Sequence, residues 1–492
     1  MPDNVTERLA EYARTDGWDD NIAFIADEQE WTFAQVYAGA ARAAGGYRAA
    51  GLRPADRVLL ALPDSIEMVW CMLGAWQAGL VAIPVNVHMS RADLERDVAT
   101  AEPALAVTDP ETAGWLDAAG VVRTCGAGTL TGAEPDPGFA PGDEAPALGM
   151  FTSGTTGNPK LCFFLHRDLG VRMEIYGLPG AGAVGFSASR MCFRGGLGSG
   201  LFASLIDGQA TVLSRPRPTP AIAVELMRRH RVTALFSPPS FLARLLLEPG
   251  HEEVLDALRS ATCVGEAMSA RIREQLVPLL GERLINGYGS TEIGGIAVGR
   301  PADYHPSPSA VGPSLGGQPM RILDEEGNEL PAGESGQLHV RVRMGTRGVA
   351  RGSLGPDQVY DVWWATGDLA TIDENAILHV HGRLDDVEVI GGQNVVPAEV
   401  ERLLESHPRV LEGAVSAVRR PEGFTSLRAY LVAAPGEGSD LDALTSELLD
   451  LTRDRLSFYK VPDDVVWLDS LPRNGNGKIL RRQLRAQGDQ FV

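Results

Sequence analysis

The chain has 492 residues, of which 44% are hydrophobic and 22% charged, as in a soluble globular protein of roughly two to four domains. Its 64 acidic and 44 basic residues give a net charge of −20, which argues against nucleic acid and anionic membranes as main partners. The five cysteines lack metal-ligand spacing, the N-terminus is polar, and no apolar run could span a bilayer. We therefore expect a cytoplasmic protein with reduced thiols.

Short apolar runs alternate with amphipathic stretches along most of the chain. The predicted strands are 56–65, 81–86, 104–109, 233–239 and 261–267, with a predicted helix at 66–79. This alternation predicts parallel sheets flanked by helices, with functional loops at the carboxyl ends of the strands. The Gly-, Pro- and acid-rich stretch 132–147 is predicted to be a loop or linker.

From about residue 320 the pattern changes. Residues 320–342 are typical of a hairpin and meander, so antiparallel structure should follow the parallel part. Beyond a second break near 381–392, Pro397 starts a predicted helix. Two strands at 410–418 and 427–434 and a helix at 441–456 should follow, which makes residues 386–492 a small separate α+β domain.

Only three of the 44 basic residues are lysines: Lys160, Lys460 and Lys478. Arginine is a wide planar fork, whereas lysine is a compact ammonium on a thin stem. A surface charge tolerates exchange between them, but a point charge inserted between anionic oxygens does not. The three lysines are therefore the first candidates for chemistry.

The stretch "MFTSGTTGNPK" (150–160) combines hydroxyls, glycines and Lys160. Backbone N–H groups and hydroxyls in such a loop can surround phosphate oxygens, and the lysine adds positive charge. It does not fit the Walker pattern GxxxxGK[ST]. A flexible polar loop is the alternative, and the retained lysine favours phosphate binding.

This loop resembles the phosphate-binding signature of the adenylate-forming superfamily of acyl- and aryl-CoA ligases, nonribosomal adenylation domains and luciferases. Further segments resemble the superfamily's other signatures in the expected order: "GYGSTE" (287–292), "ATGDLA" (365–370), "GRLDD" (382–386) and "PRNGNGK" (472–478). The segments 185–202 and 263–269 resemble benzoate and hydroxybenzoate CoA ligases. The resemblance implies a large N-terminal domain (1–384) of parallel α/β sheets plus a distorted antiparallel part. A mobile C-terminal α+β domain (386–492) would turn about a hinge at Asp385.

The resemblance also implies ATP-dependent activation of a carboxylic acid as an acyl adenylate, with Mg²⁺, and CoA as the probable acceptor. Lys478 would bridge the carboxylate and the α-phosphate, Thr291 would touch the α-phosphate, and Glu292 would bind the metal. Tyr288 would stack on adenine, and Asp368 and Arg383 would hold the ribose. The implied nucleotide-binding residues are Thr152, Ser153, Gly154, Thr155, Thr156, Gly157, Lys160, Gly265, Glu266, Ala267, Asn286, Gly287, Tyr288, Gly289, Ser290, Thr291, Asp368 and Arg383.

The acid itself is expected to be an aryl or medium-sized apolar molecule, bound by a monomer or homodimer. The implied pocket walls are Phe193, Gly195, Leu197, Ser237, Pro238, Gly289 and Ile293. Gly195 stands where benzoate-type ligases place an aromatic residue, so the pocket should be larger or differently walled. Val389 stands where a lysine is usual and Gln393 where a bulky residue lines the pantetheine tunnel, which weakens the case for CoA.

Three functions remain open from the sequence. The first is an aryl- or acyl-CoA ligase. The second is an adenylate-forming enzyme with another acceptor, such as a carrier-protein thiol, an amine, or nitrite in diazotisation. The third is an NAD(P)-dependent oxidoreductase, because "GAGAVG" (180–185) fits GxGxxG and Asp207 follows. A lone match of this kind is weak evidence, and we expect "FSASRMCF" (186–193) to be a strand rather than the helix that such a cofactor needs.

Overall fold

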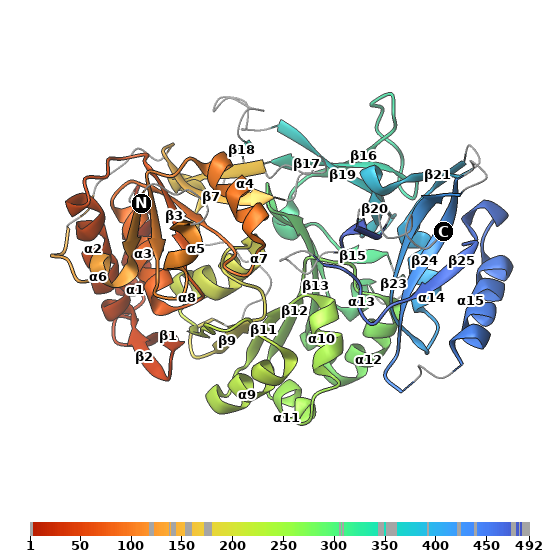
Figure 1. Cartoon of the computed structure of the whole chain (residues 1–492), viewed down its shortest axis with the longest axis horizontal. Helices are drawn as coiled ribbons and strands as arrows, with labels where there is room; N and C mark the ends of the chain where they lie inside the picture. The colour runs from red at the N-terminus through yellow and green to blue at the C-terminus, as the bar shows by residue number, and fades with distance from the viewer. Residues whose placement is uncertain are drawn as a thin grey trace.

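The structure, a computed structural model, describes residues 3–117, 123–136, 138, 144–152, 160–171, 180–304, 307, 309–342, 349–350, 362–390, 393–420, 425–436, 440–473, 479–481 and 483–484. Two large sheets and a smaller antiparallel sheet make up the part before residue 384, and two small sheets follow it. Figure 1 shows the chain running from the helices around α1 to α6 at one end to α14 and α15 at the other.

The first large sheet has seven strands in the order β18-β8-β7-β4-β3-β5-β6. Its centre is parallel, and the pairs β7–β8 and β8–β18 are antiparallel. The strands are β3 (Arg57–Ala61), β4 (Val81–Pro84), β5 (Leu105–Thr108), β6 (Thr124–Gly126), β7 (Pro146–Thr152), β8 (Lys160–Leu165) and β18 (Val349–Ala350). The helices of this region are α1 (Val5–Thr15), α2 (Phe33–Ala49), α3 (Ile66–Gln77), α4 (Arg91–Ala101), α5 (Ala113–Asp117) and α6 (Ala127–Thr131).

Helix α3 shows why these segments fold as they do. The hydroxyl of Ser65 accepts a hydrogen bond from the backbone N–H of Met68 at 3.4 Å and caps the helix, and Glu67 lies in its first turn. Nearly every following residue up to Trp76 is buried, because α3 packs against α2 and the sheet. A helix that is apolar on all sides is stable only in such a core.

The second large sheet has eight strands in the order β14-β13-β12-β11-β9-β10-β1-β2. It is parallel from β13 to β1 and antiparallel at both edges. The strands are β1 (Ile22–Ala26), β2 (Gln29–Thr32), β9 (Val184–Ser187), β10 (Ala210–Val212), β11 (Ala234–Ser237), β12 (Ser260–Cys263), β13 (Leu284–Ser290) and β14 (Gly294–Gly299). The helices are α7 (Arg194–Leu197), α8 (Ala203–Asp207), α9 (Pro220–His230), α10 (Pro239–Leu245), α11 (His251–Asp256), α12 (Ala270–Leu280) and α13 (Pro301–Tyr304).

A five-stranded antiparallel sheet in the order β15-β20-β19-β17-β16 follows. The predicted hairpin at 320–342 is confirmed as β16 paired with β17. The strands are β15 (Ala310–Gly312), β16 (Met320–Leu323), β17 (Gly336–Val342), β19 (Val362–Ile372) and β20 (Leu378–Arg383).

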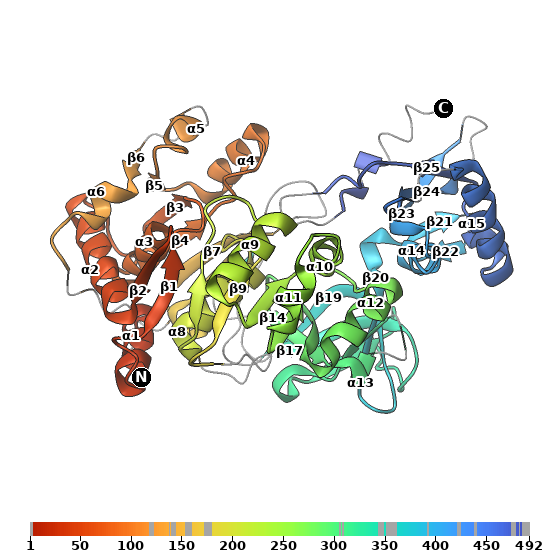
Figure 2. The same ribbon diagram turned by 90° about the horizontal axis from the view of Figure 1, so that it is seen from below.

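The elements after residue 386 form sheets and hydrophobic clusters of their own. In Figure 2 they stand together beside α12 and β20. Their bounds are β21 (Glu388–Ile390), β22 (Gln393–Val395), α14 (Pro397–Glu405), β23 (Val410–Arg419), β24 (Thr425–Ala433), α15 (Leu441–Arg455) and β25 (Asp464–Trp467). We call this part the lid and the part before it the body. The fold class is thus confirmed, and the hinge at Asp385 stays a prediction.

Most predicted elements are confirmed, but the strand predicted at 186–193 is wrong beyond Ser187. There the hydroxyl of Ser187 accepts a hydrogen bond from the N–H of Ser189 at 3.2 Å, which turns the chain. The N–H of Met191 then donates to both carboxylate oxygens of Asp64 at 3.2 Å. The carboxylate of Asp64, 127 positions away in sequence, thus accepts from a backbone N–H that would otherwise have been available for strand pairing.

Within the described residues, no helix has the length and apolarity needed to cross a membrane. All five cysteines are free thiols, and only Cys125 is not buried.

Candidate active site

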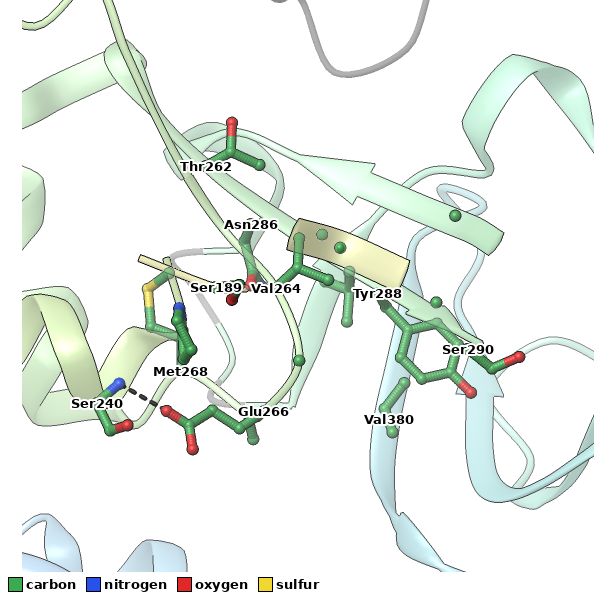
Figure 3. A pocket seen from close by; sticks show the side chains of 18 of the residues that line it. Ser189, Ser240, Thr262, Val264, Glu266, Met268, Asn286, Tyr288, Ser290 and Val380 are labelled. Carbon is green, nitrogen blue, oxygen red and sulfur yellow. Dashed lines mark hydrogen bonds between the residues drawn. The ribbon is translucent and has the colours of Figure 1, made fainter. Parts of the chain in front are cut away.

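A cavity of about 730 Å³ lies between the body and the lid. On the body side it is lined by residues at or just after the carboxyl ends of β9, β11, β12 and β13, where ligands bind in open α/β sheets. Figure 3 shows the labelled residues Ser189, Val264, Glu266 and Tyr288 around it. The predicted functional loops therefore meet at one place.

Tyr288, Asp368 and Arg383 lie together in this cavity, on β13, β19 and β20. The hydroxyl of Tyr288 donates a hydrogen bond to Oδ2 of Asp368. The guanidinium of Arg383 donates to Oδ1 of Asp368 at 3.1 Å and to the carbonyl oxygen of Thr366 at 2.9 Å. Burial, and then the carboxylate of Asp368, raise the pKa of Tyr288 above its ordinary value, so its hydroxyl stays protonated and donates.

The backbone at this site needs glycine at two positions. Gly367, beside Asp368, has φ +76, and a Cβ there would lie 2.9 Å from Nη2 of Arg383. Gly265, after β12, has φ +105. Any other residue would be strained at both positions, so these glycines allow the loops to approach the cavity.

Every described residue of the predicted nucleotide set from Gly265 to Arg383 lines the cavity, as does Glu292. Thr291 and Glu292 form the turn between β13 and β14. Among the described residues there is no group of three or more His, Cys, Asp or Glu side chains that could hold a metal. The single carboxylate of Glu292 is compatible with Mg²⁺, because proteins often bind this ion through one carboxylate while substrate phosphates and water complete its coordination.

Aromatic rings also line the cavity. Phe193 and Gly195 line it as predicted, and Phe236 on β11 lines it as well. A Cβ on Gly195 would lie 2.9 Å from Cζ of Phe236, so the ring occupies the space beside the glycine. Arg194 also lines the cavity, and its guanidinium carbon lies 5.1 Å from the centre of the Phe164 ring. An aromatic side chain from β11 thus lies against Gly195 of α7, and whether the pocket is larger or differently walled than in benzoate-type ligases stays a prediction.

Three predicted wall residues do not line the cavity. Ser237 faces the opposite side of β11 from Phe236 and Pro238, because side chains alternate along a strand. Leu197 packs into the core around α3, and Ile293 packs into the core of the five-stranded sheet. Pro238 and Gly289 do line the cavity.

From the lid, Arg473 and Arg481 line the cavity on either side of the segment that carries Lys478. Arg473 forms ion pairs with Glu266 at 3.2 Å and Glu412 at 3.0 Å. Arg481 pairs with Glu401 at 2.7 Å and Asp386 at 3.5 Å. Lys478 itself lies outside the described residues.

Of the phosphate loop, Ser153, Gly154, Thr155, Thr156 and Gly157 lie outside the described residues. Thr152 ends β7 and Lys160 begins β8, and the backbones of these two residues are partners in the antiparallel pair. Lys460 forms an ion pair with Glu399 of α14, its Nζ lying 2.8 and 2.7 Å from the two carboxylate oxygens.

The segment 180–185 does not have the geometry of a dinucleotide-binding motif. Gly180 and Gly182 have positive φ, and β9 begins at Val184, so the glycines lead into a strand. A dinucleotide fingerprint needs the reverse order, with a strand first and a helix N-terminus at the phosphates. The oxidoreductase hypothesis therefore loses its only support.

Sequence alone missed Phe236, Arg473, Arg481 and Glu412 as cavity residues. Alternation along the predicted strand 233–239 would have placed Phe236 on the face of Pro238. The arginines flank the lysine in sequence, but their partners could not be read from it.

Comparison with known proteins agrees with this geometry. Residues 11–353 match the AMP-binding enzyme family, and residues 399–478 match the AMP-binding enzyme C-terminal domain. The chain is 33% identical to the p-hydroxybenzoic acid–AMP ligase FadD22 of Mycobacterium tuberculosis, over 98% of this chain and 69% of that protein. It is 30% identical to the benzoate–CoA ligase of Thauera aromatica, over 94% of this chain and 92% of that protein.

A benzoate CoA ligase from Burkholderia xenovorans LB400 has a similar solved structure, with a TM-score of 0.88. The two chains are 26% identical, and the match covers 98% of this chain and 99% of that one.

Proposed function

Because the chain belongs to the AMP-binding enzyme family of adenylate-forming ligases, we propose that it activates an aryl carboxylic acid with ATP and passes the acyl group to CoA. The observation that carries this proposal is the cavity in which Asp368 is held by Tyr288 and Arg383 and which aromatic side chains also line. Its size and lining suit a nucleotide beside a flat apolar acid.

The first half-reaction joins two anions. An oxygen of the carboxylate attacks the α-phosphorus of ATP, the bond from the α-phosphorus to the bridging oxygen breaks, and pyrophosphate leaves with the electron pair. An ammonium about 4 Å from the developing charge contributes on the order of 4 kcal/mol at an effective dielectric constant near 20. We assign this charge to Lys478, which precedes the cavity-lining residue Ile479.

The remaining roles follow from the chemistry of the side chains. Asp368 is an acceptor for ribose hydroxyls, and Arg383 fixes its orientation. Thr291 and Lys160 would contact phosphate oxygens. Glu292 would hold Mg²⁺, which when bound neutralises phosphate charge. The lid would turn about Asp385 for the second half-reaction.

A second acceptor class remains a candidate because of the segment after the hinge. Val389, in place of the usual lysine, has 59% of its surface exposed, so this position offers no charge to CoA. A carrier-protein thiol, an amine or nitrite are the alternatives to CoA. The acceptor is tested separately from adenylate formation.

The test of adenylate formation is pyrophosphate release from ATP with a panel of aryl and aliphatic acids. We expect release with aryl acids, and release with none of the acids would contradict the proposal. Lys478→Ala and Lys478→Arg should both abolish it while ATP still binds. The matched control is Lys460→Arg, which keeps the ion pair with Glu399 and should remain active. Adding CoA, amines or nitrite to the active pairs then identifies the acceptor.

A further inference from the structure

One ion pair joins the lid to the loop at the nucleotide end of the cavity. Nη1 of Arg473 lies 3.2 Å from Oε2 of Glu266, across 207 positions of sequence. Nη2 of Arg473 lies 3.0 Å from Oε2 of Glu412, which belongs to the lid. The three side chains are 14%, 22% and 16% exposed, so solvent screens them only in part.

Glu266 is fixed from the body side as well. Its Oε1 accepts a hydrogen bond from the backbone N–H of Ser240 at 2.7 Å (Figure 3). Ser240 lies in the first turn of α10, where backbone N–H groups have no partner within the helix. One oxygen of Glu266 is thus committed to the body and the other to the lid, so the body sets the position of Arg473.

Arg473 in turn takes part in the backbone contacts that join the two ends of the segment carrying Lys478. Arg473 pairs with Ile479 in an antiparallel bridge, and the N–H of Leu480 donates to the carbonyl oxygen of Pro472 at 2.8 Å. On the other flank, Arg481 is bound to Glu401 within the lid. Of these two flanking arginines, Arg473 is the one that reaches the body.

A second contact between lid and body involves neither Arg473 nor Glu266. The guanidinium of Arg271 on α12 donates to the carbonyl oxygens of Pro408, at 2.8 Å, and of Val410. It attaches the lid through backbone, without a charged partner. Arg271 therefore offers a matched control for general adhesion of the lid.

We propose that the ion pair between Arg473 and Glu266 is a latch that positions the Lys478 segment for adenylate formation and opens when the lid turns. The inference rests on the proposed function. A contact made in only one pose stabilises that pose alone. Glu266 and Arg473 are thus positioning residues, and their loss should affect the two half-reactions differently.

The test is Glu266→Gln, which keeps an oxygen for Ser240 and removes the charge that holds Arg473. At saturating ATP, pyrophosphate release in a single turnover should slow on the order of tenfold. Transfer of the acyl group from preformed adenylate to the acceptor should not slow. Arg473→Met should act alike, and the double variant should be no slower than either single variant.

Equal slowing of both half-reactions, or additive losses in the double variant, would overturn the latch. Arg271→Met is expected to leave the ratio of the two rates unchanged, because it weakens the lid contact without releasing Arg473. The same change of ratio in Arg271→Met would also overturn the latch, since any loosening of the lid would then suffice.

An activity-independent readout separates the latch from the proposed function. Spin labels at Leu247→Cys and Phe458→Cys, both exposed positions, report the distance between body and lid once the partly exposed Cys125 is changed to Ser. Glu266→Gln should broaden this distance distribution in the free enzyme, and an unchanged distribution would overturn the latch. If no acid releases pyrophosphate, the proposed function fails while this measurement still decides about the latch.

Discussion

Asp368 offers the sharpest test of the nucleotide site, through the variant Asp368→Asn. The carboxylate accepts from Tyr288 at one oxygen and from Arg383 at the other. An amide keeps one acceptor oxygen and presents an N–H donor where the second was. A ribose hydroxyl would therefore lose its acceptor, and the ion pair with Arg383 would lose its charge.

The size of the effect follows from these contacts. Hydrogen bonds to charged groups contribute about 1.5–3 kcal/mol each, and Asn loses one while weakening the other. We expect a loss of about 3 kcal/mol, or roughly 150-fold in the apparent affinity for ATP. The fold should survive, because the hydroxyl of Tyr288 can turn to accept from the amide.

The assay is pyrophosphate exchange as a function of ATP concentration. Glu374→Gln is the control, since it removes a charge from the exposed turn between β19 and β20. Tyr288→Phe keeps the ring and frees Oδ2 of Asp368, so the KM for ATP should stay constant or fall. An unchanged KM for ATP in Asp368→Asn would refute the assignment of Asp368 to the ribose.

Three further results are expected. Gly195→Ala should raise the KM for the acid and leave that for ATP unchanged, because the added Cβ would meet Phe236 at 2.9 Å; an unchanged KM for the acid removes this wall from the pocket. Burial lowers the pKa of His166 to about 4, so the unfolded chain alone takes up a proton as the pH falls from 6.5 to 4. The contribution of His166 to the free energy of unfolding should therefore fall by about 2 kcal/mol between pH 7 and pH 5. Chemical denaturation at the two pH values should show a smaller loss in His166→Gln. Burial raises the pKa of Glu405 to about 8, so the folded state keeps a proton that the unfolded chain releases above pH 4.5. Stability should drop by about 2 kcal/mol from pH 6 to pH 8, and Glu405→Gln should remove that drop; a wild-type stability that does not change over this range would contradict the prediction.

The pattern of apolar residues predicted most strands and helices correctly, because the burial of one or both faces of an element imposes that pattern on the sequence. The run 56–65 contains four consecutive buried residues of β3, and Pro397 begins α14. The turn at Ser187 could not be predicted, since the donor of Met191 is taken by Asp64, far away in sequence. Long-range partners of this kind leave no local periodicity.

The same limit applies to the site. Motif resemblance predicted the cavity residues from Gly265 to Arg383, but it also named Ser237, Leu197 and Ile293, which do not line the cavity. Phe236 against Gly195 and Arg473 against Glu266 depend on packing between segments, which one sequence does not reveal. Lys478 was predicted from its motif, and the prediction stays open because Lys478 lies outside the described residues.

The contacts between lid and body bear on the proposed rotation of the lid. They include the ion pair between Arg473 and Glu266 and the bonds from Arg271 to the carbonyl oxygens of Pro408 and Val410. A partly exposed ion pair contributes about 0–1 kcal/mol, far less than a buried apolar interface of the same extent. Polar contacts of this kind hold the described pose only weakly, so in the proposed rotation the binding energy of substrates would decide which pose is populated.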